Sequence, residues 1–347
     1  MRIGIVNDLA PMNELLRRFV CLRPGHEVIW TAASGAEAIE YCSTQAPDLI
    51  LMDLVMPVMD GVETTRRIMA STPCAILLVT VSVRDNVGLV FEAIGHGALD
   101  AVDIPMTGGG NLPHAAEPFL AKIDIISRLA SGKSAIRTAA EPGGPRAART
   151  NRVSRPRHYD QLVAIGASAG GPAVLATVLR CLPKDVPAAI VIVQHVDERF
   201  ASGLADWLDH ESALPVRVAK EGDRPSVGHV LLAGTGDHLE LKTADRVGYT
   251  VEPRDYVYRP SVDVFFQSVS RLWRGDVVGV LLTGMGRDGA LGLKALRTRG
   301  HYTIAQDEAT SAVYGMPKAA AMLQAAVDIL PAERIASKLM EVLTCKA

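Results

Sequence analysis

The sequence lacks long hydrophobic runs, paired cysteines and an excess of charge of one sign. No stretch approaches the roughly 18 consecutive apolar residues that span a bilayer, and the apolar run at residues 3–6 is too short for a secretion signal because Asp8 soon follows it. The five cysteines are odd in number and form no CxxC pair, which argues against a disulfide framework or a zinc site. We therefore expect a protein of the reducing cytoplasm that does not insert into a membrane.

The charge balance excludes another class of partner. Thirty-six Lys and Arg oppose 38 Asp and Glu, so the formal net charge of -2 gives no overall field that favours nucleic acid or an anionic membrane surface. The 347 residues, 48% hydrophobic and 21% charged, are typical of a globular chain with two domains. Function must therefore be inferred from local sites.

The first part of the chain alternates short apolar runs with segments of helical length. Ser34 and Glu37 have the spacing of a capping box, and Pro113 precedes a helical segment over residues 114–127. This alternation predicts βαβ units with five helices around a parallel sheet of five strands. The expected strands are residues 3–6, 28–31, 49–52, 75–80 and 99–102.

Between residues 131 and 158 this pattern gives way to Ser, Gly, Pro, Ala and Arg, with Glu141 as the only acidic residue. The composition is typical of a flexible linker with solvated charges, and contact with an acidic partner is the alternative. We therefore expect domains at residues 1–130 and 159–347, joined by a linker at 131–158.

A second α/β series follows the linker. Ser168, His195 and Asp288 each come after one of its predicted strands, in loops that contain several glycines. In an open, doubly wound sheet the loops at this edge converge and bind ligands, so we expect the three side chains to meet. The strands in question are residues 162–165, 189–193 and 277–282.

Two acidic residues mark a separate candidate site in the first domain. Asp8 and Asp53 lie at the ends of predicted strands, and Thr80 ends a third. Two carboxylates at one rim could hold Mg²⁺, and one could accept a phosphoryl group as a nucleophile. The alternative is that these residues only solubilise the strand ends.

Residues 47–61, PDLILMDLVMPVMDG, resemble the phosphorylation segment of two-component receiver domains. This resemblance implies a flavodoxin-like domain that receives its phosphoryl group from a cognate histidine kinase. By position, Asp53 would be the phosphoacceptor, Asp8, Asp53 and the Val55 carbonyl would hold Mg²⁺, and Thr80 would supply the switch hydroxyl.

The sequence departs from the receiver pattern at two positions. Asn7 precedes Asp8 where receivers usually have a second acid, so we expect weaker Mg²⁺ binding. Ile104 stands before Pro105 where the family has a Lys that pairs with the phosphoryl group. We expect Asp53 to be phosphorylated all the same, with altered switching.

The G-x-S-x-G sequence around Ser168 fits a nucleophile elbow at a strand-to-helix turn. Alone, such a turn can equally pack a strand against a helix or bind a phosphate. His195 could act as the base and Asp288 could orient it, which gives the chain order Ser, His, Asp rather than the order of α/β-hydrolases.

Three separated segments together resemble the protein-glutamate methylesterase domain of chemotaxis: GASAGGP at 166–172, QH at 194–195 and LLTGMGRDGA at 281–290. The resemblance implies that Ser168 is the nucleophile, His195 the general base and acid, and Asp288 the orienting carboxylate. The loop residues Gly284 and Met285 would form part of the oxyanion hole, next to Ala169, where many members have Thr.

This resemblance also implies a substrate and a regulator. Family members hydrolyse glutamate methyl esters on the cytoplasmic helices of methyl-accepting chemoreceptors, deamidate receptor glutamines, and are inhibited by their own unphosphorylated receiver. In having Asn7 and lacking that Lys, the sequence is most similar to the methylesterase of Wsp-type surface-sensing systems. The output of those systems is a diguanylate cyclase response.

Two other functions remain as alternatives. A phosphorylation-controlled transcription factor would need a basic helix-turn-helix, and the second half reads instead as buried strands. A non-catalytic scaffold that binds receptors would not need Ser168, His195 and Asp288 together.

Overall fold

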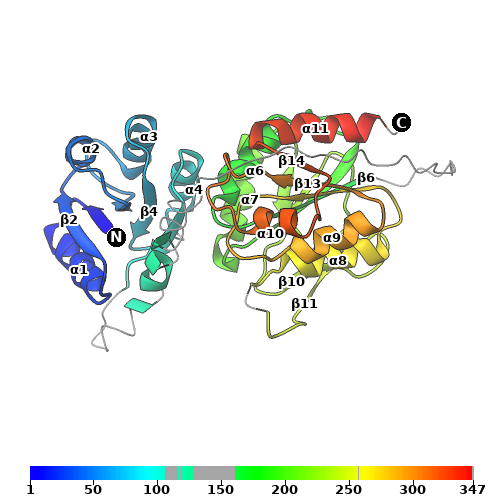
Figure 1. The fold of residues 1–347 in the computed structure, drawn as a ribbon, viewed down its shortest axis with the longest axis horizontal. Helices are drawn as coiled ribbons and strands as arrows, with labels where there is room; N and C mark the ends of the chain where they lie inside the picture. The colour runs from blue at the N-terminus through cyan, green and yellow to red at the C-terminus, as the bar shows by residue number, and fades with distance from the viewer. Residues whose placement is uncertain are drawn as a thin grey trace.

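The computed structural model describes residues 1–83, 85–105, 116–117, 119–124, 126–127, 161–256 and 258–345. Two open parallel sheets, each covered by helices, form the two halves of the molecule, and helix α4 lies between them (Figure 1). Among the described residues no helix is long and apolar enough to cross a membrane. The predicted linker at 131–158 lies outside the described residues, so the domain boundaries stay predictions.

The N-terminal half is a five-stranded parallel sheet in the order β2-β1-β3-β4-β5. Its strands consist mainly of buried aliphatic residues because helices cover both faces of the sheet. The described positions between 116 and 127 are also helical. Its other elements are β1 (Arg2–Val6), α1 (Ala10–Cys21), β2 (Glu27–Ala32), α2 (Gly35–Thr44), β3 (Leu49–Asp53), α3 (Gly61–Ser71), β4 (Ala75–Thr80), α4 (Val87–Gly95) and β5 (Asp100–Asp103).

The predicted helix start at Ser34 is confirmed. The Ser34 hydroxyl accepts a hydrogen bond from the Glu37 N–H, and the Glu37 carboxylate accepts one from the Ala33 N–H. In a standard capping box the Glu carboxylate accepts from the N–H of the N-cap residue itself, whereas here the donor is the N–H of Ala33, one residue before the N-cap. Together the two bonds fix where α2 begins.

The C-terminal half contains a seven-stranded sheet in the order β14-β13-β12-β6-β7-β9-β8 and a separate β10-β11 hairpin. The five predicted receiver strands and the three predicted strands of this half all form, within two residues of their expected ends. Its elements are β6 (Gln161–Ala167), α6 (Gly171–Arg180), β7 (Ala188–Gln194), α7 (Glu198–Glu211), β8 (Val216–Val218), β9 (Val230–Leu232), β10 (His238–Leu241), β11 (Val247–Thr250), α8 (Val262–Leu272), β12 (Val277–Leu281), α9 (Ala290–Thr298), β13 (Tyr302–Gln306), α10 (Met316–Met322), β14 (Asp328–Leu330) and α11 (Ala332–Thr344).

The order of the central strands decides where the candidate site lies. Strands β12, β6 and β7 are neighbours and all run parallel. Their carboxyl ends therefore form one continuous edge in the middle of the sheet, where loops and helix N-termini converge.

Candidate active site and receiver pocket

The three predicted catalytic residues lie at this edge. Ser168 directly follows β6, His195 directly follows β7, and Asp288 lies in the loop between β12 and α9. Ser168 and Asp288 are buried, whereas part of His195 is accessible. The structure places His195 in direct contact with Asp288, and Ser168 and His195 line the same cavity.

The turn that carries Ser168 requires its glycines. Gly170 has a φ of 74°, in the left-handed region that favours glycine, and it precedes the first turn of α6. Opposite the serine, a Cβ built on Gly284 would lie 2.6 Å from the Ser168 Cβ, so only glycine allows the two loops to approach this closely. Ser168 is fixed from behind by its N–H, which donates to the Thr283 carbonyl at 3.0 Å.

His195 is oriented by Asp288. The His195 Nε2 lies 2.7 Å from the Asp288 Oδ2, so Nε2 carries the proton and donates it to the carboxylate. The other ring nitrogen, Nδ1, is buried and has no hydrogen-bond partner in the part of the chain that the structure describes. Nδ1 is therefore the basic nitrogen, the reverse of the usual arrangement in which Nδ1 faces the acid.

Asp288 is held by a set of backbone and side-chain donors. Besides His195, its two oxygens accept from the Ser261 hydroxyl at 2.8 Å and the Val262 N–H at 2.7 Å. The N–H groups of Asp263 and Gly289 each donate at 3.0 Å. Burial acts to raise the pKa of Asp288, but these donors and the charge of His195 outweigh it, and the pKa lies below its ordinary value. A charged Asp288 can stabilise the imidazolium that forms when His195 accepts a proton.

Ser168 and His195 line one cavity of about 230 Å³, together with Ala169, Gly170 and Met285. Since His195 Nδ1 has no partner, the Ser168 hydroxyl does not form a hydrogen bond with it in this conformation. The cavity is where a reacting group would meet both residues.

The predicted oxyanion residues differ in what they can donate. The Gly284 N–H is already used, because it donates to the Val313 carbonyl at 3.0 Å. The N–H groups of Met285 and Ala169 donate to no residue that the structure describes. The N–H groups of Met285 and Ala169 are thus available beside Ser168, while Gly284 supplies space rather than a hydrogen bond.

Sequence reasoning missed two residues that organise this site. Ser261 caps α8 and donates to Asp288, and its place before a helical segment was a usable signal for an N-cap. Gln194 is buried, and its amide donates to the Ser168 and His195 carbonyls at 2.9 and 3.1 Å. It therefore ties the loop of the serine to the loop of the histidine.

The receiver pocket has few donors by comparison. The Asn7 amide donates to the Asp53 Oδ2 at 2.7 Å, and the Val55 N–H lies 3.4 Å from Oδ1. Burial raises the pKa of Asp53 to about 6, the charge of Asp8 adds to the increase, and the N–H groups of Val55 and Leu54 oppose it. Asn7 thus occupies one oxygen of the predicted phosphoacceptor.

The residues of this pocket fit a weak Mg²⁺ site. No cluster of three or more His, Cys, Asp or Glu side chains that could hold a metal occurs among the described residues. Two carboxylates and one carbonyl still suit Mg²⁺, which often binds one or two carboxylates and keeps several waters. The Ile104 side chain is buried in the receiver core, so that position presents no cation to the pocket. The Thr80 hydroxyl is buried and accepts from the Asn86 amide at 3.2 Å.

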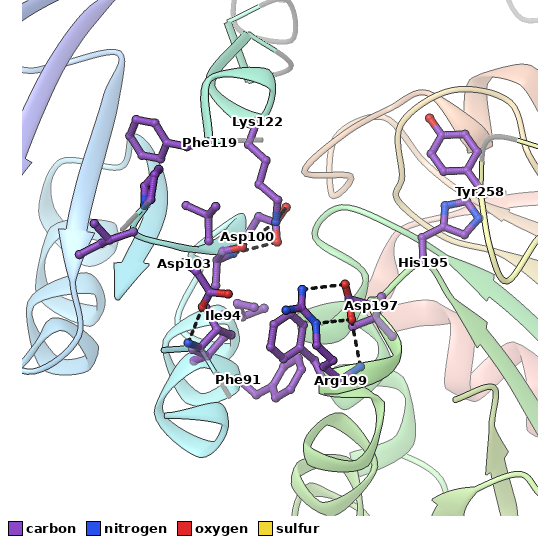
Figure 2. Close-up of a pocket in the computed structure, with 18 of the residues that line it drawn as sticks. Phe91, Ile94, Asp100, Asp103, Phe119, Lys122, His195, Asp197, Arg199 and Tyr258 are labelled. Atoms are coloured by element: carbon purple, nitrogen blue, oxygen red, sulfur yellow. Dashed lines mark hydrogen bonds and ion pairs between the residues drawn. The ribbon is translucent and has the colours of Figure 1, made fainter. Parts of the chain in front are cut away.

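The receiver covers the candidate active site. Phe91 and Ile94 of α4 line the same 230 Å³ cavity as Ser168 and His195. A second cavity of about 700 Å³ lies between the two halves, with His195 on one side and Asp100 and Lys122 on the other (Figure 2). In this conformation, side chains of the receiver form one wall of both spaces.

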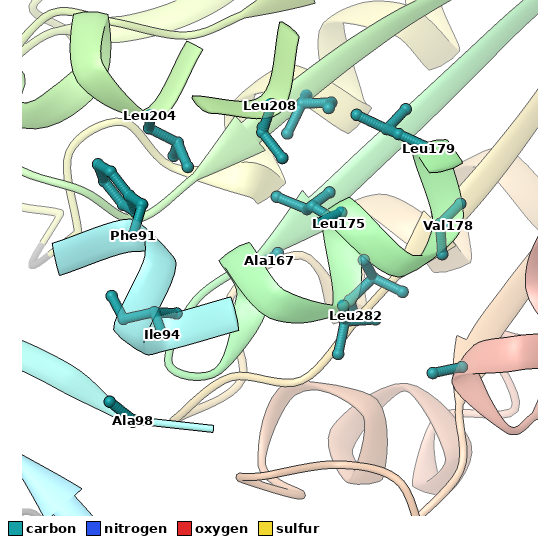
Figure 3. Packing of buried hydrophobic residues seen from close by; sticks show 14 of the residues in the cluster. Phe91, Ile94, Ala98, Ala167, Leu175, Val178, Leu179, Leu204, Leu208 and Leu282 are labelled. Atoms are coloured by element: carbon teal, nitrogen blue, oxygen red, sulfur yellow. The ribbon is translucent and has the colours of Figure 1, made fainter. Parts of the chain in front are cut away.

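Helix α4 makes this contact by packing on α7 and α6. The rings of Phe91 in α4 and Trp207 in α7 stack with their centroids 5.8 Å apart. A Cβ built on Gly203 of α7 would lie 1.7 Å from the Val87 side chain of α4, so only glycine allows the two helices to pack this closely at that point. Phe91 and Ile94 join one hydrophobic cluster with Leu204, Leu208 and Leu175 of the other half, so the contact buries apolar side chains of both (Figure 3).

Comparisons with known proteins agree with both halves. Residues 163–339 match the family model described as CheB methylesterase, and residues 3–109 match that described as response regulator receiver domain. The solved catalytic domain of the Thermotoga maritima CheB methylesterase is 36% identical with a TM-score of 0.50, and the match covers 53% of this chain and 98% of that chain.

Two relatives match over almost their full length. A protein of Pseudomonas syringae pv. syringae (strain B728a), named protein-glutamate methylesterase/protein-glutamine glutaminase 2, is 57% identical over 99% of this chain and 100% of its own. A protein of Burkholderia thailandensis (strain ATCC 700388 / DSM 13276 / CCUG 48851 / CIP 106301 / E264) has the same name with the number 4. It is 58% identical over 98% of this chain and 97% of its own length. Because such matches extend through both sheets, this chain belongs to the CheB methylesterase family and has a response regulator receiver domain at its N-terminus.

Proposed function

We propose that this chain hydrolyses glutamate γ-methyl esters, and deamidates glutamines, on the cytoplasmic helices of methyl-accepting chemoreceptors. The observation that carries the proposal is the pairing of His195 Nε2 with Asp288, which leaves Nδ1 as an unpartnered base in the cavity of Ser168. The names of the full-length relatives support the same two activities. We also propose that the protein acts in the cytoplasm, where this substrate lies.

The chemistry follows from which nitrogen is free. The Ser168 Oγ attacks the ester carbonyl, and its proton moves to His195 Nδ1 while Nε2–H stays bound to Asp288. The N–H groups of Met285 and Ala169 stabilise the oxyanion, and each such donor lowers the barrier by about 3 kcal/mol in serine hydrolases. Methanol, or ammonia from a glutamine, leaves with the Nδ1 proton, and water then releases the glutamate by the reverse steps.

Regulation comes from the receiver. Asp53 accepts a phosphoryl group from a histidine kinase, and Asp8, Asp53 and the Val55 carbonyl would hold Mg²⁺, which would offset charge on the transferred oxygens. Because α4 lines the catalytic cavity, an unphosphorylated receiver blocks the approach of a receptor helix, and phosphorylation shifts the population toward an open arrangement. Asn7 and Ile104 support an output of the surface-sensing type.

Methanol release from methylated receptor membranes tests the activity. The intact chain treated with a phosphodonor is expected to release methanol, and Ser168→Ala is expected to release none above background. Equal release by the two proteins would exclude Ser168 as the nucleophile, and no release from any of several receptors would favour the scaffold alternative.

A further inference from the structure

We propose that Tyr258 is a positioning residue for His195, an inference that rests on the proposed function of Ser168 and His195. The two rings lie nearly parallel, with an angle of 3° between their planes and centroids 4.4 Å apart. Figure 2 shows the tyrosine ring directly against the imidazole, beside the cavity between the two halves. One face of the catalytic base is therefore covered by an aromatic side chain.

The backbone places Tyr258 with the same segment that holds Asp288. Tyr258 lies between β11 and α8, three residues before Ser261, whose hydroxyl donates to the Asp288 Oδ1. The following residue, Val262, donates its N–H to Oδ2. One short stretch of chain thus fixes the carboxylate that binds an edge of the imidazole and the ring that covers its face.

The far end of the tyrosine is also positioned. A Cβ built on Gly286 would lie 3.2 Å from the Tyr258 hydroxyl oxygen, so the phenol lies against the loop that carries Met285. Burial raises the pKa of Tyr258, and the charge of Asp288 adds to the increase, so the phenol stays neutral in the range where His195 works. The tyrosine therefore spans from the base to the oxyanion loop.

The stack supplies what the Asp288 hydrogen bond cannot. A single bond at Nε2 fixes one edge of the imidazole but leaves the ring free to tilt about that bond. A parallel aromatic face restricts the tilt and keeps Nδ1 directed into the cavity of Ser168. The same face attracts the imidazolium that forms when Ser168 gives up its proton.

The test is the rate at which the full-length protein reacts with a fluorophosphonate probe, followed by mass spectrometry. In this reaction the Ser168 Oγ bonds to phosphorus, fluoride leaves, and His195 Nδ1 takes the hydroxyl proton, so no receptor is needed. Tyr258→Leu is expected to react about 10-fold more slowly than wild type because the base is misplaced. Tyr258→Phe keeps the stack and is expected to react within about 2-fold of wild type.

Two further readouts separate positioning from general damage. The ¹⁵N resonances of the His195 ring are expected to report the Nε2–H tautomer in wild type and in Tyr258→Phe, and a mixture of tautomers in Tyr258→Leu. With receptor membranes, Tyr258→Leu is expected to lower kcat about 10-fold and to leave KM within 2-fold. If Tyr258→Leu does not fold, Tyr258→Met carries the same test.

Tyr256 offers a matched control in the same loop, because its ring meets that of His238 edge-on, with centroids 6.0 Å apart, and it lines neither of the two cavities that His195 lines. Tyr256→Leu is expected to react at the wild-type rate. Equal rates for Tyr258→Leu and wild type, or equal losses in Tyr258→Phe and Tyr258→Leu, would overturn the role of the stack. Labelling that persists in Ser168→Ala would instead overturn the proposed function, so the two failures are distinguishable.

Discussion

Each half of this protein places an aspartate at the carboxyl edge of its sheet, Asp53 at the end of β3 and Asp288 in the loop after β12, and the surroundings shift the pKa values of the two carboxyl groups in opposite directions. Asp288 accepts hydrogen bonds from His195, Ser261 and three backbone N–H groups, and its pKa is lowered despite burial. Asp53 is offered the Asn7 amide and a more distant Val55 N–H, and burial raises its pKa to about 6. Asp288 therefore stays charged to a lower pH than Asp53, because His195 and backbone N–H groups stabilise its charge whereas burial dominates at Asp53.

This difference matches the two roles. Asp288 must stay charged throughout a reaction in order to stabilise an imidazolium, so its donors are built into the fold. Under the proposed function Asp53 exchanges partners, since it would bind Mg²⁺ and accept a phosphoryl group that is later removed.

Removing the charge of Asp288 should have the largest effect. Asp288→Asn is expected to lower kcat for methanol release by about 10⁴-fold, because an amide does not hold the Nε2–H tautomer or stabilise the imidazolium. Circular dichroism should show that the variant is folded. A folded variant with a loss smaller than 10-fold would mean that Asp288 does not orient the base.

Loosening the contact between the two halves should raise basal activity. Phe91→Ala removes the ring that stacks on Trp207 and lines the Ser168 cavity, and it is expected to increase the unphosphorylated rate about 10-fold. The rate after phosphodonor treatment serves as the control, since wild type and variant should then converge. An unchanged basal rate in a folded variant would show that α4 does not limit access.

Restoring a second acid should strengthen metal binding. Asn7→Asp is expected to tighten Mg²⁺ binding to the receiver about 10-fold, measured by titration calorimetry, because a further carboxylate joins Asp8 and Asp53. Asn7→Ala removes the same amide without adding charge and should not reproduce that gain. Equal affinities in Asn7→Asp and wild type would contradict the proposed Mg²⁺ site.

A pH dependence of stability, rather than of activity, is expected at Asp263, which is buried next to Asp288. Burial raises the pKa of Asp263 from an ordinary value near 3.8 to about 6, with the charge of Asp288 adding to it. The folded state then binds a proton more tightly than the unfolded state, so the contribution to stability is full below about pH 4 and is lost as pH rises through about 6. The free energy of unfolding of wild type relative to Asp263→Asn should fall by about 2 kcal/mol between pH 4 and pH 7. Parallel pH profiles would contradict the shift.

Much of the fold was predictable because both sheets are buried on both faces. Runs such as residues 75–79 and 189–193 are continuously aliphatic, so their strands could be located without knowledge of their neighbours. The convergence of His195 and Asp288 followed from the rule that functional loops meet at the carboxyl ends of parallel strands. These inferences depend on local pattern and topology alone.

The remaining features depend on contacts between distant residues. Which nitrogen of His195 faces Asp288 is decided by the position of the loop that carries Asp288, which Ser261 and Val262 fix. The stacking of Tyr258 on His195 depends on the path of a loop with no regular period. The fit of Val87 against Gly203 depends on how two separate sheets dock. No spacing in the sequence indicates such contacts.

The central claim is that the receiver controls access to Ser168 through the contact of α4. The most direct test is the rate of fluorophosphonate labelling of Ser168 in the full-length protein before and after treatment with a small-molecule phosphodonor and Mg²⁺, compared with Asp53→Asn. The account predicts faster labelling after treatment in wild type, no acceleration in Asp53→Asn, and no labelling in Ser168→Ala. Equal acceleration in wild type and Asp53→Asn, or labelling of wild type that does not change on treatment, would contradict it.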